Sequence, residues 1–413
     1  MEVSPAYKQT EVGLIPKDWD VRPLSRLADI RGGIAKNGNT TVLDPISVHY
    51  LRVANVQDGF LSLGEMSKIE LSRGDLPRYK VLPGDVLMNE GGDLDKLGRG
   101  AIWRGEFDPC VHQNHVFVVR CKTDLVPEYL NIWTATSPVR RFFLVAGKQT
   151  TNLASISKSS LGELPVALPS LPEQRAIAAA LSDVDALLTG LNSLIAKKRE
   201  IKQAAMQQLL TGQTRLPGFQ GEWEETNLGA IGECIIGLTY TPENVVDHGL
   251  LVLRSSNVQN GRLDYDDNVH VNVKVAEHLY TREGDILICV RNGSSRLIGK
   301  CAVIDKKAAR VTFGAFMSVY RTKHWRFIHH AFQAEDIQCQ IRDNIGATIN
   351  QITNKDMKSF RVKLPPVLEQ IAIATVLSDM DAELTALEAR RDKTRALKQG
   401  MMQELLTGRT RLV

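Results

Sequence analysis

LPSLPEQRAIAAALSDVDALLTGLNSLIAKKREIKQAAMQQLLTGQTRL, residues 168–216, is the stretch that decides the fold, because the chain contains it twice. The second copy, residues 364–412, reads LPPVLEQIAIATVLSDMDAELTALEARRDKTRALKQGMMQELLTGRTRL. About 28 of about 49 aligned positions are identical, which is far beyond chance for a self-comparison. The copies lie about 196 residues apart, which is too long a period for a solenoid. The sequence therefore predicts a duplication, with two large units that each end in one long helix.

The apolar residues of both copies alternate steps of four and three, as in the seam of a helix that packs along another helix. In the first copy these residues are Ile177, Leu181, Val184, Leu188, Leu191 and Ile195. In the second copy they are Ile373, Leu377, Met380, Leu384 and Leu387. Polar residues interrupt the seam at Lys198 and at 391–394. We expect it to resume with Ile201, Ala205 and Leu209 in the first copy and with Leu397, Met401 and Leu405 in the second. Gly212 is the expected C-cap of the first helix. The simplest partner for each helix is the other one, and two unrelated surface helices explain the seam less well.

The composition is that of an ordinary globular protein of two or three domains. The chain has 413 residues, with 51 Lys and Arg against 47 Asp and Glu, so its net charge is +4. This mild excess permits nucleic-acid binding without requiring it. No apolar run approaches the length that a bilayer requires, and the N-terminus lacks the pattern of a signal peptide. The six cysteines form no CxxC pair, which favours reduced thiols in a cytoplasmic protein.

The rest of the chain is also duplicated, with one similar unit before each helix. Trp19 and Trp223 open equivalent units. The matching segments are 51–52 with 253–254, 55–59 with 257–261, 84–87 with 284–287 and 98–102 with 299–303. They are short and bounded by turn residues, as strands are, whereas 129–143 and 328–341 are predicted to be helical. Apolar residues at helical spacing also occur near the start, at Leu24, Leu27 and Ile30.

The predicted fold is therefore mixed α/β, in the order domain, helix, domain, helix. We place the first domain at 1–168, its helix at 169–212, the second domain at 213–364 and its helix at 365–413. Two similar domains tied to two similar helices indicate a pseudo-two-fold arrangement. If the helices pair as an antiparallel coiled coil, the two domains are separated by a helical spacer.

This layout resembles the specificity subunit of type I restriction–modification enzymes. The resemblance rests on the Leu-Pro, Glu-Gln, Leu-Ser-Asp and Leu-Leu-Thr-Gly motifs of both copies, on the start at 13–19 and on the restart at 218–223. It covers essentially the whole chain, and it implies two target-recognition domains that each read one half of a bipartite, asymmetric DNA site. One departure is Val367-Leu368, where the first copy has Leu171-Pro172, which bears on the angle at which the second helix begins.

The resemblance also implies partners for the chain. These are double-stranded DNA, two modification subunits (adenine-N6 methyltransferases) docked on the paired helices, and restriction subunits that join this core. AdoMet, ATP and Mg²⁺ are then expected on the partner subunits, with no cofactor and no catalytic residue on this chain. No membrane is expected among the partners.

Motifs for independent chemistry are weak. The glycine-rich segment 293–301 comes near a P-loop, but it has one residue too many between the glycines, and Cys301 stands where Ser or Thr should hold Mg²⁺. Cys110, His112 and His115 suggest a metal site, yet the two histidines point to opposite faces if this segment is a strand. No methyltransferase motif surrounds Asp108-Pro109. We therefore expect neither a metal site nor an active site.

Base contacts should concentrate where the two copies disagree, because each domain would read a different half-site. The candidates in the first domain are Lys36, Asn37, Asn39, Asn89, His112, Gln113, Asn114, His115, Thr151 and Asn152. Those in the second domain are Tyr240, Arg291, Asn292, Ser294, Arg296, Asn350 and Gln351. Amide side chains can pair with an adenine edge, and Arg or Lys can read guanine. For any single residue, a solvated turn is the alternative.

Basic residues that match between the copies are better placed for sequence-independent phosphate contacts, or for surface ion pairs. They are Arg52 with Arg254, Arg99 with Lys300 and Arg120 with Arg321. Two other functions compete with DNA reading. One is a coiled-coil assembly scaffold whose domains bind protein, and the other is an enzyme with its own nuclease or methyltransferase site. Apolar residues left over on the helices could cover the domains or receive a partner's helices. They are Leu187, Leu194, Met206, Leu210, Met402 and Leu406.

Overall fold

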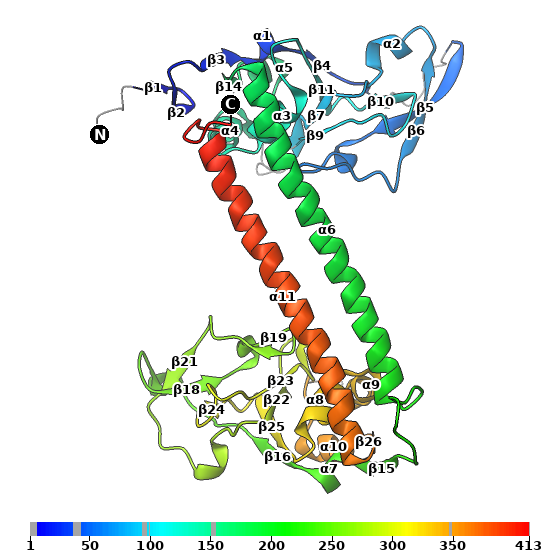
Figure 1. Ribbon diagram of the computed structural model, residues 1–413, viewed down its shortest axis with the longest axis vertical. Coiled ribbons are helices and arrows are strands. Elements are labelled where there is room, and N and C mark those ends of the chain that lie inside the picture. Colours follow the sequence, from blue (N-terminus) through cyan, green and yellow to red (C-terminus); the bar gives the residue numbers. More distant parts are fainter. Residues whose placement is uncertain are drawn as a thin grey trace. The chain divides into compact units, whose positions relative to one another are not determined.

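The structure, a computed structural model, describes residues 6–35, 43–92, 97–98, 100–149, 154–346 and 349–412. It divides into two compact units, Met1–Leu191 with Arg390–Val413, and Asn192–Ala389. Each unit holds one mixed α/β domain and one half of each long helix, so the expected fold class is confirmed (Figure 1).

The first unit combines short strands with short helices. Its strands are β1 (Tyr7–Thr10), β2 (Gly13–Pro16), β3 (Asp20–Pro23), β4 (Ala28–Arg31), β5 (Pro45–Leu51), β6 (Ser67–Ser72), β7 (Val86–Asn89), β8 (Gly91–Gly92), β9 (Gly100–Ile102), β10 (Cys110–His112), β11 (Val116–Cys121), β12 (Lys148–Gln149), β13 (Ala154–Ser155) and β14 (Pro165–Leu168). Its helices are α1 (Leu24–Leu27), η1 (Val53–Asn55), α2 (Leu76–Tyr79), α3 (Pro127–Thr134), α4 (Ser137–Ala146) and α5 (Lys158–Gly162).

The second unit repeats this plan. Its strands are β15 (Glu224–Asn227), β16 (Glu233–Ile236), β17 (Val245–Val246), β18 (Leu250–Leu253), β19 (Val258–Gln259), β20 (Arg262–Leu263), β21 (Val269–Val271), β22 (Ile286–Cys289), β23 (Cys301–Val303), β24 (Thr312–Phe313), β25 (Met317–Arg321) and β26 (Arg361–Leu364). Its helices are α7 (Leu228–Ile231), η3 (Pro242–Asn244), η4 (Ser255–Asn257), η5 (Glu277–Leu279), η6 (Ser295–Leu297), α8 (Trp325–Gln333), α9 (Glu335–Asn344) and α10 (Asn354–Ser359).

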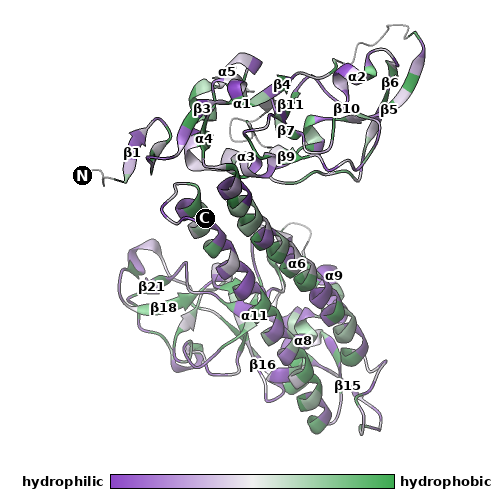
Figure 2. Ribbon diagram, turned by 45° about the horizontal axis from the view of Figure 1, so that its top comes forward, coloured by the Kyte–Doolittle hydropathy of each residue, from purple (hydrophilic) through white to green (hydrophobic). Residues whose placement is uncertain are grey.

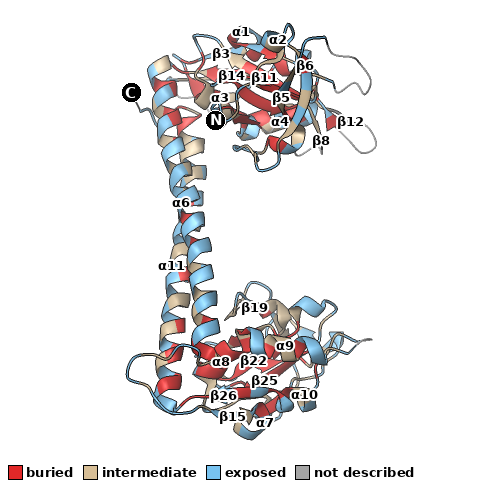
Figure 3. Ribbon diagram, turned by 90° about the vertical axis from the view of Figure 1, so that its right-hand side faces the viewer, coloured by how far each residue is buried: buried red, intermediate tan, exposed pale blue. Residues whose placement is uncertain are grey.

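A four-stranded antiparallel sheet forms the centre of each domain. Its strand order is β4-β11-β7-β9 in the first unit and β16-β25-β22-β23 in the second. The central strands β7 and β22 are buried at every residue, because side chains on both faces of the sheet enter apolar clusters (Figure 3). A second sheet in each unit contains a parallel pair, β10 with β5 and β24 with β18.

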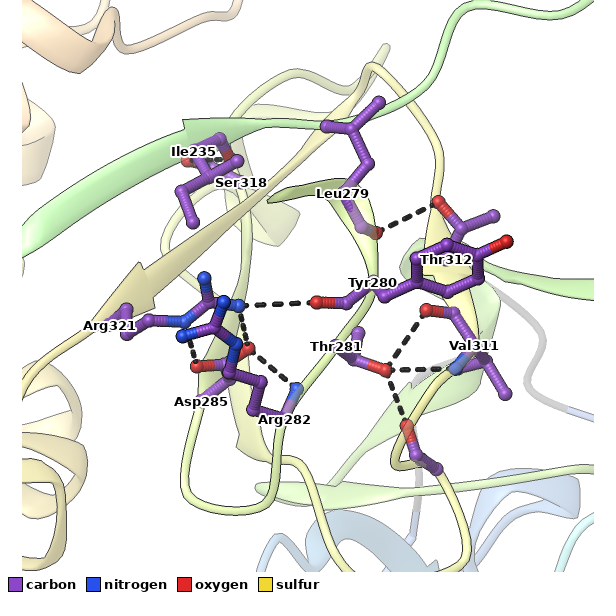
Figure 4. Close-up of polar contacts among 11 residues, drawn as sticks. Ile235, Leu279, Tyr280, Thr281, Arg282, Asp285, Val311, Thr312, Ser318 and Arg321 are labelled. Carbon is purple, nitrogen blue, oxygen red and sulfur yellow. Dashed lines mark hydrogen bonds and ion pairs between the residues drawn. The ribbon is translucent and has the colours of Figure 1, made fainter. Parts of the chain in front are cut away.

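A buried ion pair fixes the same turn in both sheets. The guanidinium group of Arg120 donates two hydrogen bonds of 2.8 and 2.7 Å to Asp85. Arg321 makes the same two bonds to Asp285 and also donates to the Tyr280 carbonyl (Figure 4). Both carboxylates are only 2% exposed. Arg120 and Arg321 therefore form ion pairs within the scaffold, and the carboxylates of these pairs are buried rather than on the surface as was considered for them.

The short helix near the start differs from its prediction. Helix α1 ends at Leu27, and Ile30 lies in strand β4, where it pairs with Val119. The spacing of these apolar residues arises from one helical turn followed by a half-buried strand. The two longer segments predicted to be helical are each two helices, α3 with α4 and α8 with α9.

The two long helices are α6 (Leu171–Leu210) and α11 (Val367–Leu405), with 40 and 39 residues. Apolar and polar residues alternate along both (Figure 2). Within each unit the helices run antiparallel, because residues of increasing number in α6 pair with residues of decreasing number in α11. In the first unit Lys398 contacts Asp185 at 2.6 Å. In the second unit Lys198 contacts Glu383 at 2.7 Å, and Lys202 contacts Asp381 at 2.6 Å.

The seam is buried where it was predicted to begin, but where it was expected to resume only its last residues, Leu209 and Leu405, are buried. Ile177, Leu181 and Ile195 are at most 2% exposed, whereas Ile201 and Leu397 are 43% and 59% exposed. At the point of resumption, Lys202 lies in the interface in place of Ile201, and its ammonium group is neutralised by Asp381. By length and composition alone, α6 meets a weak criterion for crossing a membrane. Core helices meet the same criterion, and the charged residues of α6 pair with α11.

The Glu-Gln motif anchors the start of each long helix to its own domain. Glu173 accepts hydrogen bonds from Trp19 Nε1 (3.1 Å) and from Arg411. Glu369 accepts equivalent bonds from Trp223 Nε1 (3.3 Å) and from Arg215 (2.5 and 2.6 Å). The next residues, Gln174 and Gln370, fix the chain just before the same helices by donating to the carbonyl groups of Pro169 and Pro365. Helices α6 and α11 end at Leu210 and Leu405, and Gly212 (φ 73°) and Gly408 (φ 67°), shortly after these ends, adopt the left-handed conformation. For Gly212 this agrees with its predicted role at the C-terminal cap.

Candidate nucleic-acid interface

Four segments of the first unit meet at one end of its central sheet, and we call them the first turn edge: 33–35, 89–92, 112–115 and 154–156. Backbone hydrogen bonds hold them together. Ile34 N donates to His112 O (2.8 Å), and Asn114 N donates back to Ile34 O (3.0 Å). Glu90 N donates to His115 O (3.0 Å), and Ile156 N donates to Glu90 O (2.9 Å). The chain thus brings four distant segments to one place.

The second unit has a second turn edge, made of 237–241, 290–296, 313–316 and 349–352, with the same backbone pattern. Leu238 N donates to Phe313 O (2.7 Å), and Ala315 N donates to Leu238 O (2.9 Å). Val290 N donates to Phe316 O (3.0 Å), and Ile352 N donates to Val290 O (2.9 Å). Each bond has its counterpart in the first unit, so Glu90 is equivalent to Val290, and His115 is equivalent to Phe316. The side chains differ although the backbone is the same.

Two predicted residues of the first turn edge belong to the scaffold. His112 is 1% exposed, and its Nδ1 lies 2.6 Å from Val116 O. Burial lowers the pKa of His112 to about 4, so this ring is neutral at physiological pH. Asn89 is 4% exposed and donates to Val56 O at 3.0 Å. Neither side chain can reach DNA without unfolding the domain, so we remove both from the candidates.

The other described candidates of this edge are more open. His115 is exposed, and its Nδ1 lies 3.0 Å from a carboxylate oxygen of Glu90. Asn114 Nδ2 lies 3.3 Å from His115 Nε2. Gln113 accepts a 3.4 Å hydrogen bond from Val53 N through its Oε1. The remaining first-domain candidates lie outside the described residues: Lys36, Asn37, Asn39, Arg99, Thr151 and Asn152.

In the second turn edge, two of the predicted amide side chains, Asn292 and Asn350, form hydrogen bonds within the domain. Asn350 Nδ2 donates to Gly293 O (2.9 Å), and Asn292 Nδ2 donates to Ser255 Oγ (3.2 Å). Asn292 Oδ1 also accepts from Ser294 N (3.1 Å). Gln351 pairs with Arg291 as an isolated antiparallel bridge. These contacts place Arg291 on a fixed segment of backbone.

Two arginines of this edge point to solvent. Arg291 and Arg296 are both exposed, and neither forms an ion pair with any residue that the structure describes. The guanidinium group of Arg291 lies 5.1 Å from the ring centre of Phe316. Tyr240 is half-buried beside Gly314, and Ser294 is exposed. The edge therefore offers unpaired cationic donors beside aromatic rings.

The matched basic residues are tied to their own domains. Arg254 pairs with Asp267 at 2.8 Å. Lys300 donates to Gln259 Oε1 at 3.2 Å. Arg52 keeps its side-chain Nε buried without a hydrogen-bond partner among the described residues. Phosphate contacts from Arg254 and Lys300 would require these interactions to rearrange.

Sequence reasoning missed Phe316, whereas Glu90 lies in a turn, 89–93, that it named as a candidate. Phe316 is 55% exposed although it is a large apolar residue, and Glu90 pairs with the exposed His115. A signal was available, because the segments just before β11 and β25 align as Gln-Asn-His and Gly-Ala-Phe. The disagreement between copies was noted there only for the first domain.

No cluster of three His, Cys, Asp or Glu side chains able to hold a metal occurs among the described residues. The segment 293–301, which comes near a P-loop, contains the short helix η6 and leads into strand β23. All six cysteines are free thiols.

Comparison with known proteins gives a consistent result. Residues 16–203 and 220–395 each match the sequence model of the type I restriction modification DNA specificity domain. The MjaX specificity subunit described for Methanocaldococcus jannaschii is 26% identical over 98% of this chain and 97% of its own length. The EcoKI specificity subunit of Escherichia coli is 28% identical over 45% of this chain and 42% of its own.

Two solved structures share the fold. The S subunit of a type I restriction–modification system from M. genitalium aligns with a TM-score of 0.60 and 14% identity, over 98% of both chains. A chain from a study of assembly and conformational transition of the type I system aligns with a TM-score of 0.56 and 17% identity, over 95% of this chain and 99% of that one.

Proposed function

The chain belongs to the family of type I restriction–modification DNA specificity proteins, and from this premise we propose that it is the DNA-reading, non-catalytic subunit of a restriction–modification complex. Each domain reads one half of a bipartite, asymmetric site through its turn edge. The observation that carries this proposal is the pair of turn edges, which share their backbone hydrogen bonds and differ in their exposed side chains. Two readers of different half-sites need such a combination.

The partners of the complex follow from the same premise. We place two modification subunits on the long helices, with restriction subunits joined to that core, and AdoMet, ATP and Mg²⁺ on these partners. Exposed apolar residues on the helices support this placement, namely Leu187, Leu194, Ile201 and Leu397. Other apolar helix residues are already used by the domains, because Leu406 and Met402 pack in the first core, and Met206 and Leu210 pack in the second.

Selection of duplexes from a random library by the full chain tests the proposal. The expected result is one motif with two specified halves and an unspecified gap. Affinity should fall steeply with salt, by about a thousandfold between 50 and 200 mM if six or more phosphates are contacted. A chain that enriches no motif, or whose binding to a protein partner ignores salt, would instead be an assembly scaffold.

A separate measurement tests the absence of catalysis. The full chain with AdoMet and its selected duplex should transfer no methyl group, whereas adding the modification subunits should methylate adenine in the site. Methylation by the chain alone would show that it carries its own active site. Mapping methylated adenines in the host genome would then identify the target independently.

A further inference from the structure

The general function does not explain one pair of side chains, the exposed Phe316 and the Arg291 guanidinium group that lies over its ring. We propose that these two side chains act as one reading unit, which recognises a guanine and a neighbouring thymine in the half-site of the second domain. This inference rests on the proposed function, because it names the bases that the second turn edge selects.

The backbone fixes both side chains. Val290 N and Arg291 N donate to the same carbonyl oxygen, that of Phe316, at 3.0 and 3.1 Å. On the other side Arg291 pairs with Gln351, and Asn350 Nδ2 holds the Gly293 carbonyl at 2.9 Å. The positions of the arginine and of the aromatic ring are therefore set before any ligand arrives, which reduces the entropy lost on binding.

The cation–π contact with Phe316 leaves the N–H groups of the Arg291 side chain without a hydrogen-bond partner among the described residues. The guanidinium group lies 5.1 Å from the ring centre of Phe316. A cation over an aromatic face keeps its N–H groups available in the plane of the guanidinium. Arg291 has no carboxylate partner among the residues that the structure describes. Two of its unpaired N–H donors can therefore bind the O6 and N7 acceptors of guanine in the major groove.

The phenylalanine supplies a different kind of contact. Its side chain is 55% exposed, although an apolar ring of this size is normally buried. In the major groove, the apolar group that a side chain can detect is the C5 methyl of thymine, which cytosine lacks. Because the ring and the guanidinium are in contact, the two bases that they read must be neighbours, on the same strand or on opposite strands.

The first domain provides the comparison within the same chain. At the equivalent backbone position it places His115, which pairs with Glu90 at 3.0 Å. A histidine paired with a carboxylate offers neither a phenyl ring nor a guanidinium group, the two groups present at the second turn edge. The same scaffold position therefore carries two different chemistries, and the guanine-and-thymine reading applies only to the second domain.

Base analogues in the selected duplex test this reading with the full chain. Replacing the guanine by 7-deazaguanine removes the N7 acceptor, and we expect binding to weaken about fivefold or more. Replacing the thymine by uracil removes only the methyl group, and we expect a loss of about fourfold. The loss from uracil should vanish in Phe316→Ala and persist in part in Phe316→Leu. The loss of affinity caused by 7-deazaguanine should vanish in Arg291→Ala. In Arg291→Lys the preference for guanine should fall, while the attraction of the positive charge to phosphate remains.

The matched control is His115→Ala, which should keep both analogue effects in the second half-site. Thermal melting of each variant shows whether it folds. The reading unit would be wrong, while the proposed function stands, in either of two cases. In one, the wild-type chain selects a bipartite site that lacks a guanine next to a thymine. In the other, neither analogue weakens its binding to the selected site. If the variants bind the analogues with undiminished losses, other residues read these bases. If the chain selects no site at all, the proposed function itself fails.

Discussion

At the scale of single residues, the carboxylates of Glu173 and Glu369 are the side chains whose ion pairs should matter most for the free energy of unfolding. Both are fully buried, and each is neutralised by one arginine from the far end of the other copy of the repeat. Arg411, which binds Glu173, also contacts Asp18 at 2.8 Å. The two carboxylates together raise the pKa of Arg411. These contacts connect the last described residues of the chain to its first domain.

Arg411→Ala should therefore destabilise the first unit, because it leaves the buried Glu173 without its cation. We expect the free energy of unfolding to fall by about 2 kcal/mol, a value below that of a fully buried pair because the arginine is partly exposed. Urea denaturation measures this loss. Arg409→Ala is the control, since Arg409 meets Glu404 at 3.7 Å with both side chains exposed, and it should cost less than about 1 kcal/mol. Equal losses from the two variants would contradict a special role for Glu173.

Buried histidines make stability depend on pH. Burial lowers the pKa of His112 and of His330 to about 4, from an ordinary value near 6.5. Between these values the unfolded chain binds a proton that the folded chain does not bind, so stability falls as pH drops from about 6.5 to about 4. Above that window these two residues leave stability unchanged.

The prediction for His112 is a loss of up to about 1.4 kcal/mol per pH unit within the window, and His112→Gln should remove this contribution. Urea unfolding at several pH values between 7.5 and 4.5 gives the slope for each chain. Asn114→Ala serves as the control, because it changes a side chain in the same segment and removes no titratable group. A slope that is the same with and without His112 would show that other groups cause the acid sensitivity.

At the scale of elements, the loop between β22 and β23 carries two exposed arginines, and the role of Arg296 is separable from that of Arg291. Arg296 lies in η6, without an ion pair to any described residue. Arg296→Ala should weaken binding to duplexes with an intact second half-site and leave discrimination in the first half-site unchanged. We expect about 1–3 kcal/mol if it reads a base. Fluorescence anisotropy with duplexes altered in one half at a time measures the effect.

The control for Arg296 is Arg361→Ala, because Arg361 is an exposed arginine of the same unit on strand β26, away from the turn edge. It should change no half-site preference. If Arg296→Ala weakens binding equally on all sequences and lowers the salt dependence, the side chain contacts phosphate rather than a base.

The elements also show what sequence patterns can and cannot predict. The long helices were predictable because their seam repeats over many turns, and the matched segments gave the strands because both copies carry them. The polar interruption was predicted at Lys198, but Lys202 was not recognised as an interface residue, since its partner Asp381 lies in the other copy. Trp19 and Arg411 were not recognisable as partners of Glu173, because 154 and 238 residues separate them from it. Phe316 was missed because a single aromatic residue in a turn has no periodicity.

At the scale of the whole molecule, the duplication produces two similar units that share both long helices. The two-unit division falls between Leu191 and Asn192 in α6, and between Ala389 and Arg390 in α11. The helix pairing within the first unit includes Asp185 with Lys398, and that within the second includes Lys202 with Asp381. An insertion at both division points therefore keeps the interactions of each unit intact. This property allows the proposed spacer role of the helices to be tested.

Four residues inserted at both points lengthen each helix by about 6 Å, which corresponds to one or two base pairs of B-DNA. If the helices set the distance between the two readers, selection from random duplexes should return the same two half-sites with the gap longer by one or two base pairs. An insertion in α6 alone is the matched control, because it shifts the helices against each other and should destabilise their pairing. A doubly inserted chain that folds and keeps the original gap would show that the helices do not measure the distance. Loss of specific binding by a folded chain would show that the four added residues rotate the two domains out of phase with the DNA. Insertions of eight residues would then show whether the added length or the added rotation prevents binding.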